Sequence, residues 1–345
     1  MKKYIAAVLA CFCALSSLTA CGGSAANTPS MLSSTGGENA IQIVTTIFPE
    51  YDWVREVLGD QADRAQVTML MDSSTDLHSY QPTAEDILRV STCDLFLYVG
   101  GESDEWAEDA LKEASNPEMK VVNLLDALGD SAKLEETVEG MQESEHDHGD
   151  EDHDHEDGEE HDHDHGEEVD EHVWLSLKNA QFLCGVIADA LAELDPDHAE
   201  DYRANASAYC GKLSALDGQY QAAVDAAGRE TLLFGDRFPF RYLVDDYGLS
   251  YYAAFSGCSA ETEASFETVA FLAAKVDELG LNTVCTIEKS DQKIAQTIIQ
   301  NTQAKNQQIV ALDSMQSVTA QDVAAGVSYL SIMESNLEAL TQALK

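Results

Sequence analysis

The chain from residue 40 onward alternates short apolar runs with longer stretches of helical periodicity. Short apolar runs flanked by polar segments are typical of buried strands, and the first half of the chain has them at residues 41–46, 67–71, 95–99 and 120–123. Apolar positions spaced as on one helix face lie between these runs, at residues 51–58, 83–90 and 104–114. Strands separated by such helices favour parallel pairing in an open α/β sheet.

The same alternation returns in the second half of the chain. Strands are predicted at residues 231–234, 251–255, 283–287 and 309–312. Helices are predicted at residues 238–247, 265–279 and 291–301, and a terminal helix begins at Ala320. The pattern therefore predicts a second α/β lobe with a mostly parallel sheet of its own.

Helical sequence without an internal proline connects the two halves. Residues 176–193 are amphipathic and stop before Pro196, and residues 197–229 are rich in Ala, Leu, Tyr, Gln and Glu. We therefore expect one long helix to join two lobes that have a cleft between them. The predicted boundaries are an N-terminal lobe at residues 40–195, a linking helix at 196–229 and a C-terminal lobe at 230–345.

Residues 145–168 interrupt the first lobe with a tract of His, Asp and Glu. Its histidines are His146, His148, His153, His155, His161, His163 and His165. Such a tract buries too little apolar surface to offset the entropy of ordering it, so we predict a mobile loop. Neutral imidazoles suit zinc, copper and nickel, and carboxylates add oxygen ligands. The tract is predicted to bind divalent metal ions weakly and transiently, and a purely solvated acidic linker is the alternative.

The overall charge points to a cation as the ligand. The chain has 19 basic and 63 acidic residues, giving a formal net charge of -44. Such an excess of acid argues against a nucleic-acid partner.

The N-terminus predicts export and lipid anchoring. Two lysines precede an apolar run that begins at Ile5 and is too short to span a membrane. Leu-Thr-Ala-Cys at residues 18–21 resembles the box of bacterial lipoproteins, in which the cysteine is lipidated. We expect a signal peptide at residues 1–20, a lipid on Cys21, and a flexible tether at residues 21–39 that holds the protein at the outer face of the bacterial cytoplasmic membrane.

The remaining cysteines show no recognisable disulfide pattern. They are Cys93, Cys184, Cys210, Cys258 and Cys285. Their number is odd and their spacing contains no CxxC pair, so the sequence predicts scattered small apolar residues. An exported protein has room for one disulfide, and its pairing stays open.

Several metal-binding side chains follow predicted strands. His78 follows the strand ending at residue 71, and Asp236, Glu288 and Asp313 come directly after or close to the ends of three strands of the second half. Ligands of open α/β sheets bind outside the carboxyl ends of the strands, so these residues could converge on one cleft. His172 joins them from the end of the acidic tract.

These residues lie in phrases that resemble a known family, the zinc and manganese substrate-binding lipoproteins of bacterial ABC transporters. The phrases are IVTTIFPEYDWVREVLGD, DLHSYQPTAEDI around His78, DEHVWLSLKNA around His172, YLVDDYGL, and IVALDSM around Asp313. The resemblance implies two α/β lobes joined by one rigid long helix, with the metal site in the cleft between the lobes. A histidine-rich loop is characteristic of the zinc members. The implied partners are a membrane permease and its ATPase.

Carried over by position, the resemblance makes His78, His172 and Asp313 metal ligands. The position that holds a third His or Glu in the family is Gly235 here, which has no side chain to donate. Three substitutes remain open: Asp236, a residue of the loop at 257–263 such as Glu261, or water.

Two further residues bear on this site. Arg237 would repel a metal unless it pairs with Asp236 or turns outward. Glu288 is expected behind the metal ligands rather than on the metal.

The predicted function is a monomeric, membrane-tethered receptor that captures Zn²⁺ for import. The first alternative keeps the fold and binds Mn²⁺ or iron, because carboxylates at Asp236 and Asp313 would make a harder site. A surface adhesin and a metal buffer that uses only the tract are the others. The sequence contains no recognisable set of nucleophile, base and orienting group, which argues against an enzyme.

Overall fold

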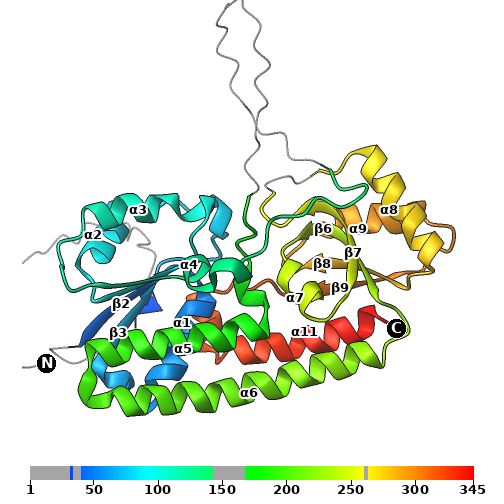
Figure 1. Ribbon diagram of the computed structural model, residues 1–345. Helices are drawn as coiled ribbons and strands as arrows, with labels where there is room; N and C mark the ends of the chain where they lie inside the picture. Colours follow the sequence, from blue (N-terminus) through cyan, green and yellow to red (C-terminus); the bar gives the residue numbers. More distant parts are fainter. Residues whose placement is uncertain (1–31, 34–39, 143–167, 260–262) are drawn as a thin grey trace, which may run out of the picture. The chain divides into compact units, whose positions relative to one another are not determined.

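The predicted strands form two separate sheets, as Figure 1 shows for the computed structural model, which describes residues 32–33, 40–142, 168–259 and 263–345. The first sheet has the strand order β1-β3-β2-β4-β5, with β1 antiparallel and the other pairs parallel. Its strands are β1 (Leu32–Ser33), β2 (Ile41–Thr45), β3 (Ala65–Met69), β4 (Leu95–Tyr98) and β5 (Lys120–Asn123). The second sheet is parallel throughout, in the order β7-β6-β8-β9. Its strands are β6 (Thr231–Phe238), β7 (Ser250–Ser256), β8 (Thr283–Ile287) and β9 (Gln308–Leu312).

Helices flank both sheets. In the first lobe they are α1 (Phe48–Leu58), α2 (Ala84–Thr92), α3 (Glu105–Lys112), α4 (Leu124–Leu128) and α5 (Leu177–Leu194). The second lobe has α7 (Arg241–Asp246), α8 (Phe266–Leu279), α9 (Lys293–Asn301), α10 (Ala320–Ala324) and α11 (Tyr329–Ala343). The long helix α6 (Ala199–Asp225) has 27 residues. It packs against α1 and α5 of the first lobe and against α11 (Figure 1). These features confirm the predicted class, two α/β lobes joined by one long helix.

The described residues from Ala40 to the end of the chain belong to one compact unit. None of the described helices combines the length and the apolar character that a membrane span requires.

Several elements differ from the sequence prediction, and two of these differences have a local cause. The terminal helix is divided into α10 and α11 because Gly326, at φ +94°, turns the chain, and the Ser328 side chain accepts a hydrogen bond from the backbone N–H of Ser331 to start α11. Strand β6 continues to Phe238, where a helix was expected, and its pairing with β7 shifts register between Phe234 and Arg237. This shift lies in the segment that contains Gly235.

Trp174 ties the segment after the acidic tract to the C-terminal half of the chain. Its side chain is 1% exposed, and its indole Nε1–H donates to the carbonyl oxygen of Ser314 at 2.9 Å. The Tyr329 hydroxyl donates to the Trp174 carbonyl oxygen at 2.7 Å. The backbone immediately after His172 is therefore held by both packing and hydrogen bonds.

Glu50, in the first turn of α1, is a fully buried acid. Its Oε2 accepts the backbone N–H of Thr46 at 2.8 Å and that of Ile47 at 3.3 Å. Burial, reinforced by the charge of Asp104, raises the pKa of Glu50 from 4.5 to about 8. The folded protein thus holds a proton that the unfolded chain releases, and the free energy of unfolding falls as pH rises through this window.

We expect Glu50→Gln to weaken this pH dependence. A glutamine oxygen can accept the same two backbone hydrogen bonds without carrying a titrating proton. Between pH 5 and pH 8.5 the free energy of unfolding of the variant should fall by about 2–4 kcal/mol less than that of the wild type. Urea denaturation at both pH values measures this difference. Glu118→Gln, at an exposed site, is the control and should retain the wild-type pH dependence.

Candidate metal centre

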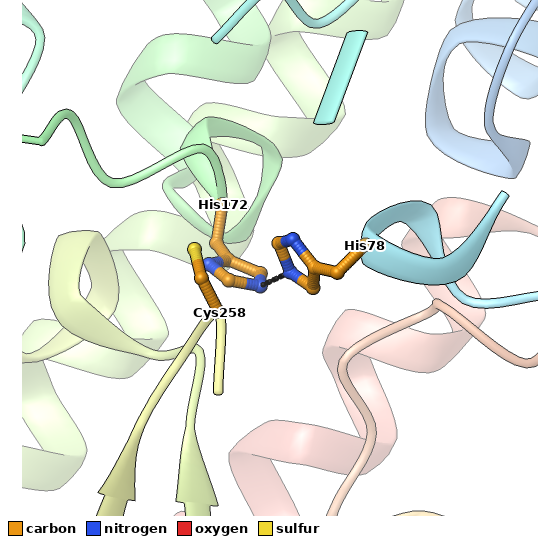
Figure 2. Close-up of side chains that lie close together, drawn as sticks. All are labelled: His78, His172 and Cys258. Carbon is orange, nitrogen blue, oxygen red and sulfur yellow. Dashed lines mark hydrogen bonds between the residues drawn. The ribbon is translucent and has the colours of Figure 1, made fainter. Parts of the chain in front are cut away.

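Two imidazoles from different segments of the first lobe face each other (Figure 2). His78 lies in the short helix η2 (Leu77–Ser79), after β3, and His172 immediately precedes the short helix η5 (Val173–Leu175). Their Nε2 atoms are 3.1 Å apart. Asp76 caps η2 by accepting the backbone N–H of His78 at 3.0 Å, which fixes the position of that histidine.

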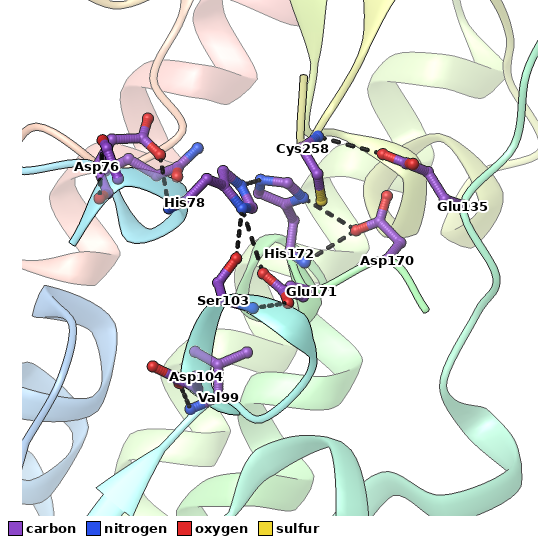
Figure 3. A network of polar contacts seen from close by, with 12 residues as sticks. Asp76, His78, Val99, Ser103, Asp104, Glu135, Asp170, Glu171, His172 and Cys258 are labelled. Atoms are coloured by element: carbon purple, nitrogen blue, oxygen red, sulfur yellow. Dashed lines mark hydrogen bonds and ion pairs between the residues drawn. The ribbon is translucent and has the colours of Figure 1, made fainter. Parts of the chain in front are cut away.

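The other nitrogen of His78 is held by an acid and a hydroxyl (Figure 3). Its Nδ1 lies 2.8 Å from the Ser103 Oγ and 3.3 Å from the Glu171 Oε2. Glu171 also accepts the backbone N–H of Ser103 at 2.8 Å. Burial alone would raise the pKa of Glu171, but the hydrogen bonds from His78 and Ser103 outweigh it and the pKa is lowered. An ionised Glu171 favours the His78 tautomer that is protonated at Nδ1 and leaves a lone pair on Nε2.

His172 is oriented in the same way. Its side chain is completely buried, and its Nδ1 lies 3.1 Å from Asp170 Oδ1. The same oxygen accepts the backbone N–H of His172 at 2.8 Å. A proton on Nδ1 leaves the Nε2 lone pair of His172 directed at that of His78. Two lone pairs at this distance repel unless a proton or a cation lies between them, so the arrangement fits a metal ion.

The loop after β7 brings a third donor to the two histidines. One ring nitrogen of each imidazole and the Cys258 sulfur all lie within 4.8 Å of one another. The backbone N–H of Cys258 donates to Glu135 Oε1 at 3.2 Å. Gly257 allows this approach, because a Cβ there would lie 2.9 Å from the His172 Cε1.

We expect Gly257→Ala to lower metal affinity. The added methyl group would also lie 2.9 Å from the Phe238 carbonyl oxygen, so the loop or His172 must shift. A displacement of a few tenths of an ångström at a ligand should weaken zinc binding on the order of tenfold, as measured by competition with a fluorescent chelator. Gly211→Ala, in α6 where a Cβ meets nothing within 4 Å, should bind zinc as the wild type does.

Asp313 and Glu288 form an acidic pair of their own at the ends of β9 and β8. Glu288 accepts the backbone N–H of Ser314 at 2.7 Å and its hydroxyl at 3.0 Å. Asp313 accepts the backbone N–H of Met315 at 2.7 Å. Burial, with the Glu288 charge, raises the pKa of Asp313 to about 6. Neither residue is in the His78–His172–Cys258 group, and their roles at the metal remain predictions.

Asp236 and Arg237 lie in a cavity of about 500 Å³ that His78 also lines. Asp236 accepts a hydrogen bond from the Ser290 hydroxyl at 2.5 Å. The Arg237 guanidinium forms an ion pair with Asp76, while the backbone N–H of Arg237 donates to Asp236. Burial would raise the pKa of Asp76, but the Arg237 charge outweighs it and the pKa is lowered. The positive charge of Arg237 is thus compensated next to His78.

His78 also lines a second cavity, of about 550 Å³. His78 and Cys258 line it together with four acids, Glu102, Glu135, Glu168 and Glu171. Its acidic lining favours cations.

Several predicted residues lie outside the described part of the chain. They are Cys21, Glu261 and the tract histidines His146, His148, His153, His155, His161, His163 and His165. Their lipidation and metal-binding roles remain predictions.

Three residues at this centre were not singled out from the sequence. Asp170 and Glu171 orient the two imidazoles, and two acids directly before His172 in the phrase DEH were the available signal. Cys258 was read as a small apolar residue, although its loop was among the segments considered as a substitute for the side chain missing at Gly235.

Known proteins resemble this chain over most of its length. The family model of zinc-uptake complex component A, periplasmic (ZnuA), matches residues 43–343. The chain belongs to the ZnuA family. It is 32% identical over 342 residues to the zinc-binding lipoprotein AdcA of Streptococcus pneumoniae, covering 99% of this chain and 61% of that protein. It is 29% identical to the high-affinity zinc uptake system protein ZnuA of Bacillus subtilis, covering 98% of this chain and 96% of that protein.

Solved structures agree with this assignment to the ZnuA family. The Zn(II)-bound ZnuA-like domain of Streptococcus pneumoniae AdcA superposes with a TM-score of 0.66 at 28% identity, covering 88% of this chain and 99% of the domain. The chain thus spans less than two thirds of full-length AdcA but nearly all of its ZnuA-like domain.

Proposed function

We propose that this protein is an extracytoplasmic receptor that binds Zn²⁺ and delivers it to an ABC importer. The observation that carries the proposal is the pair of Nε2 atoms 3.1 Å apart, each on an imidazole whose Nδ1 faces a buried carboxylate. Carboxylate–histidine pairs of this kind orient zinc ligands and raise their basicity. The same cargo is supported by the names of two relatives, a zinc-binding lipoprotein of Streptococcus pneumoniae and a zinc uptake system protein of Bacillus subtilis.

Each part of the protein has a distinct role in this proposal. The lipid on Cys21 holds the receptor at the membrane, where a permease and its ATPase accept the metal. The acidic tract at residues 145–168 raises the local metal concentration through weak sites that feed the tight one. The acidic cavity that leads to His78 favours entry of a cation.

A growth experiment tests the transport role. A strain that lacks the gene should stop growing when zinc is chelated, and added zinc should restore growth where added manganese does not. A plasmid copy of the wild type should restore growth under chelation, and a His78→Ala copy should not. Unchanged growth of the deletion strain, or rescue by manganese alone, would contradict the proposal.

A further inference from the structure

We propose that the Cys258 sulfur is the third metal donor, in place of the side chain missing at Gly235. The inference rests on the proposed metal-receptor function and specifies the chemistry of that site. It gives a donor set of two imidazoles from the first lobe and one thiolate from the second. The argument depends on which positions of the second lobe can reach the imidazoles.

The position of Gly235 is closed. A Cβ at this residue would lie 2.6 Å from the Cα of Ala295 and 2.8 Å from its Cβ. Ala295 is fully buried in α9, which packs against β6 at this point. A backbone atom of a packed helix cannot give way as a flexible side chain can. Any side chain at residue 235 would therefore require α9 to move, and no ligand can come from this position in the present packing.

The carboxylate of the neighbouring Asp236 is already engaged in other hydrogen bonds. One of its oxygens accepts the Ser290 hydroxyl at 2.5 Å, and the other accepts the backbone N–H of Arg237 at 3.0 Å. No Asp236 oxygen lies in the His78–His172–Cys258 group. The sequence neighbour of Gly235 therefore does not replace the missing ligand.

The Cys258 sulfur is the donor that the second lobe brings to the imidazoles. Figure 2 shows it beside the His172 ring, two residues after the end of β7. Gly257 permits the close approach, and the hydrogen bond from the Cys258 backbone to Glu135 holds the loop. The second lobe thus lacks a donor at Gly235 and supplies a sulfur donor at Cys258 instead.

This donor set has a defined metal preference. Thiolate and imidazole ligands suit Zn²⁺ and its spectroscopic substitute Co²⁺, whereas Mn²⁺ prefers oxygen ligands. The thiol releases its proton to solvent when the sulfur–metal bond forms. Burial and the nearby carboxylates of Glu135, Asp170 and Glu171 raise the pKa of the Cys258 thiol, so the bound metal must displace its proton, and the same carboxylates favour a divalent cation there.

Cobalt absorption tests the proposal directly. One equivalent of Co²⁺ added to the purified wild type should give an intense sulfur-to-cobalt charge-transfer band in the near ultraviolet. Histidines and carboxylates of the tract cannot produce this band, so Co²⁺ bound there does not imitate it. Cys258→Ser should lose the band and bind Co²⁺ on the order of a hundredfold more weakly. Cys210→Ser, which removes a half-buried thiol in α6, is the matched control and should keep both the band and the affinity.

The outcomes separate this inference from the proposed function. If the wild type binds Co²⁺ tightly without a sulfur band, and His172→Ala abolishes this binding, Cys258 is not a metal ligand. The proposed receptor function would still stand in that case. A band that persists in Cys258→Ser would overturn the role of Cys258 as well, by assigning the sulfur to another cysteine. Failure of the wild type to bind Co²⁺ or Zn²⁺ would overturn both.

Discussion

The His172→Ala variant is expected to bind zinc roughly a thousandfold more weakly than the wild type. Tight zinc sites in proteins bind with about 10–16 kcal/mol, so each of three or four donors accounts for about 4 kcal/mol. His172 is completely buried, and both of its ring nitrogens are engaged, one with Asp170 and the other facing His78. No described side chain nearby offers a replacement nitrogen. Competition with a chelator of known zinc affinity measures the loss.

A surface histidine supplies the control for this substitution. His198 pairs with the exposed Asp201 at 3.1 Å and lies at the start of α6, so His198→Ala should leave the tight zinc site unchanged. Thermal unfolding of the metal-free proteins separates a lost ligand from a lost fold, because His172→Ala must still unfold cooperatively. Equal zinc affinity in His172→Ala and the wild type would exclude His172 as a ligand.

Trp174→Ala is expected to destabilise the protein by about 3–5 kcal/mol, which lowers Tm by about 10 °C. The substitution removes a large buried ring and its hydrogen bond to the Ser314 carbonyl oxygen, which connects the segment after His172 to the second lobe. The ring centroid of Trp174 also lies 5.2 Å from that of His172, so zinc affinity should fall as well. Differential scanning calorimetry of the metal-free protein measures the stability change.

Phe266→Ala is the matched control for an aromatic truncation. The Phe266 side chain is 84% exposed at the start of α8, so its removal should change the free energy of unfolding by less than about 0.5 kcal/mol. A destabilisation of Trp174→Ala no larger than that of Phe266→Ala would show that Trp174 does not hold the two halves of the chain together.

The fold was predictable because buried parallel strands leave a strong signal in the sequence. The apolar runs that form β2, β4, β8 and β9 differ from their predicted ranges by at most one residue at each end. Helix boundaries were harder to predict where a glycine ends the helix, as at Gly326, because a left-handed turn leaves no apolar pattern in the sequence. Strand β6 extends beyond its predicted end. Its last residues pair with β7 after a register shift near Gly235, and this pairing cannot be predicted from the β6 sequence alone.

The metal centre was only partly predictable for a related reason. His78 and His172 lie in distinctive phrases, and the structure brings their Nε2 atoms together. The approach of Cys258 depends on contacts between distant segments, namely Gly257 against His172 and the Cys258 backbone against Glu135. The closed position at Gly235 likewise depends on α9, which lies far away in the sequence. Neither fact could be read from residue spacing.

The central claim is a dedicated metal site that is separate from the acidic tract. A calorimetric zinc titration compares the intact protein, a variant that lacks residues 145–168, and His78→Ala. The account predicts one tight site in the intact protein that survives removal of the tract and is lost in His78→Ala. If tight zinc binding is lost when the tract is removed and is unchanged in His78→Ala, the account is contradicted and the protein is a metal buffer.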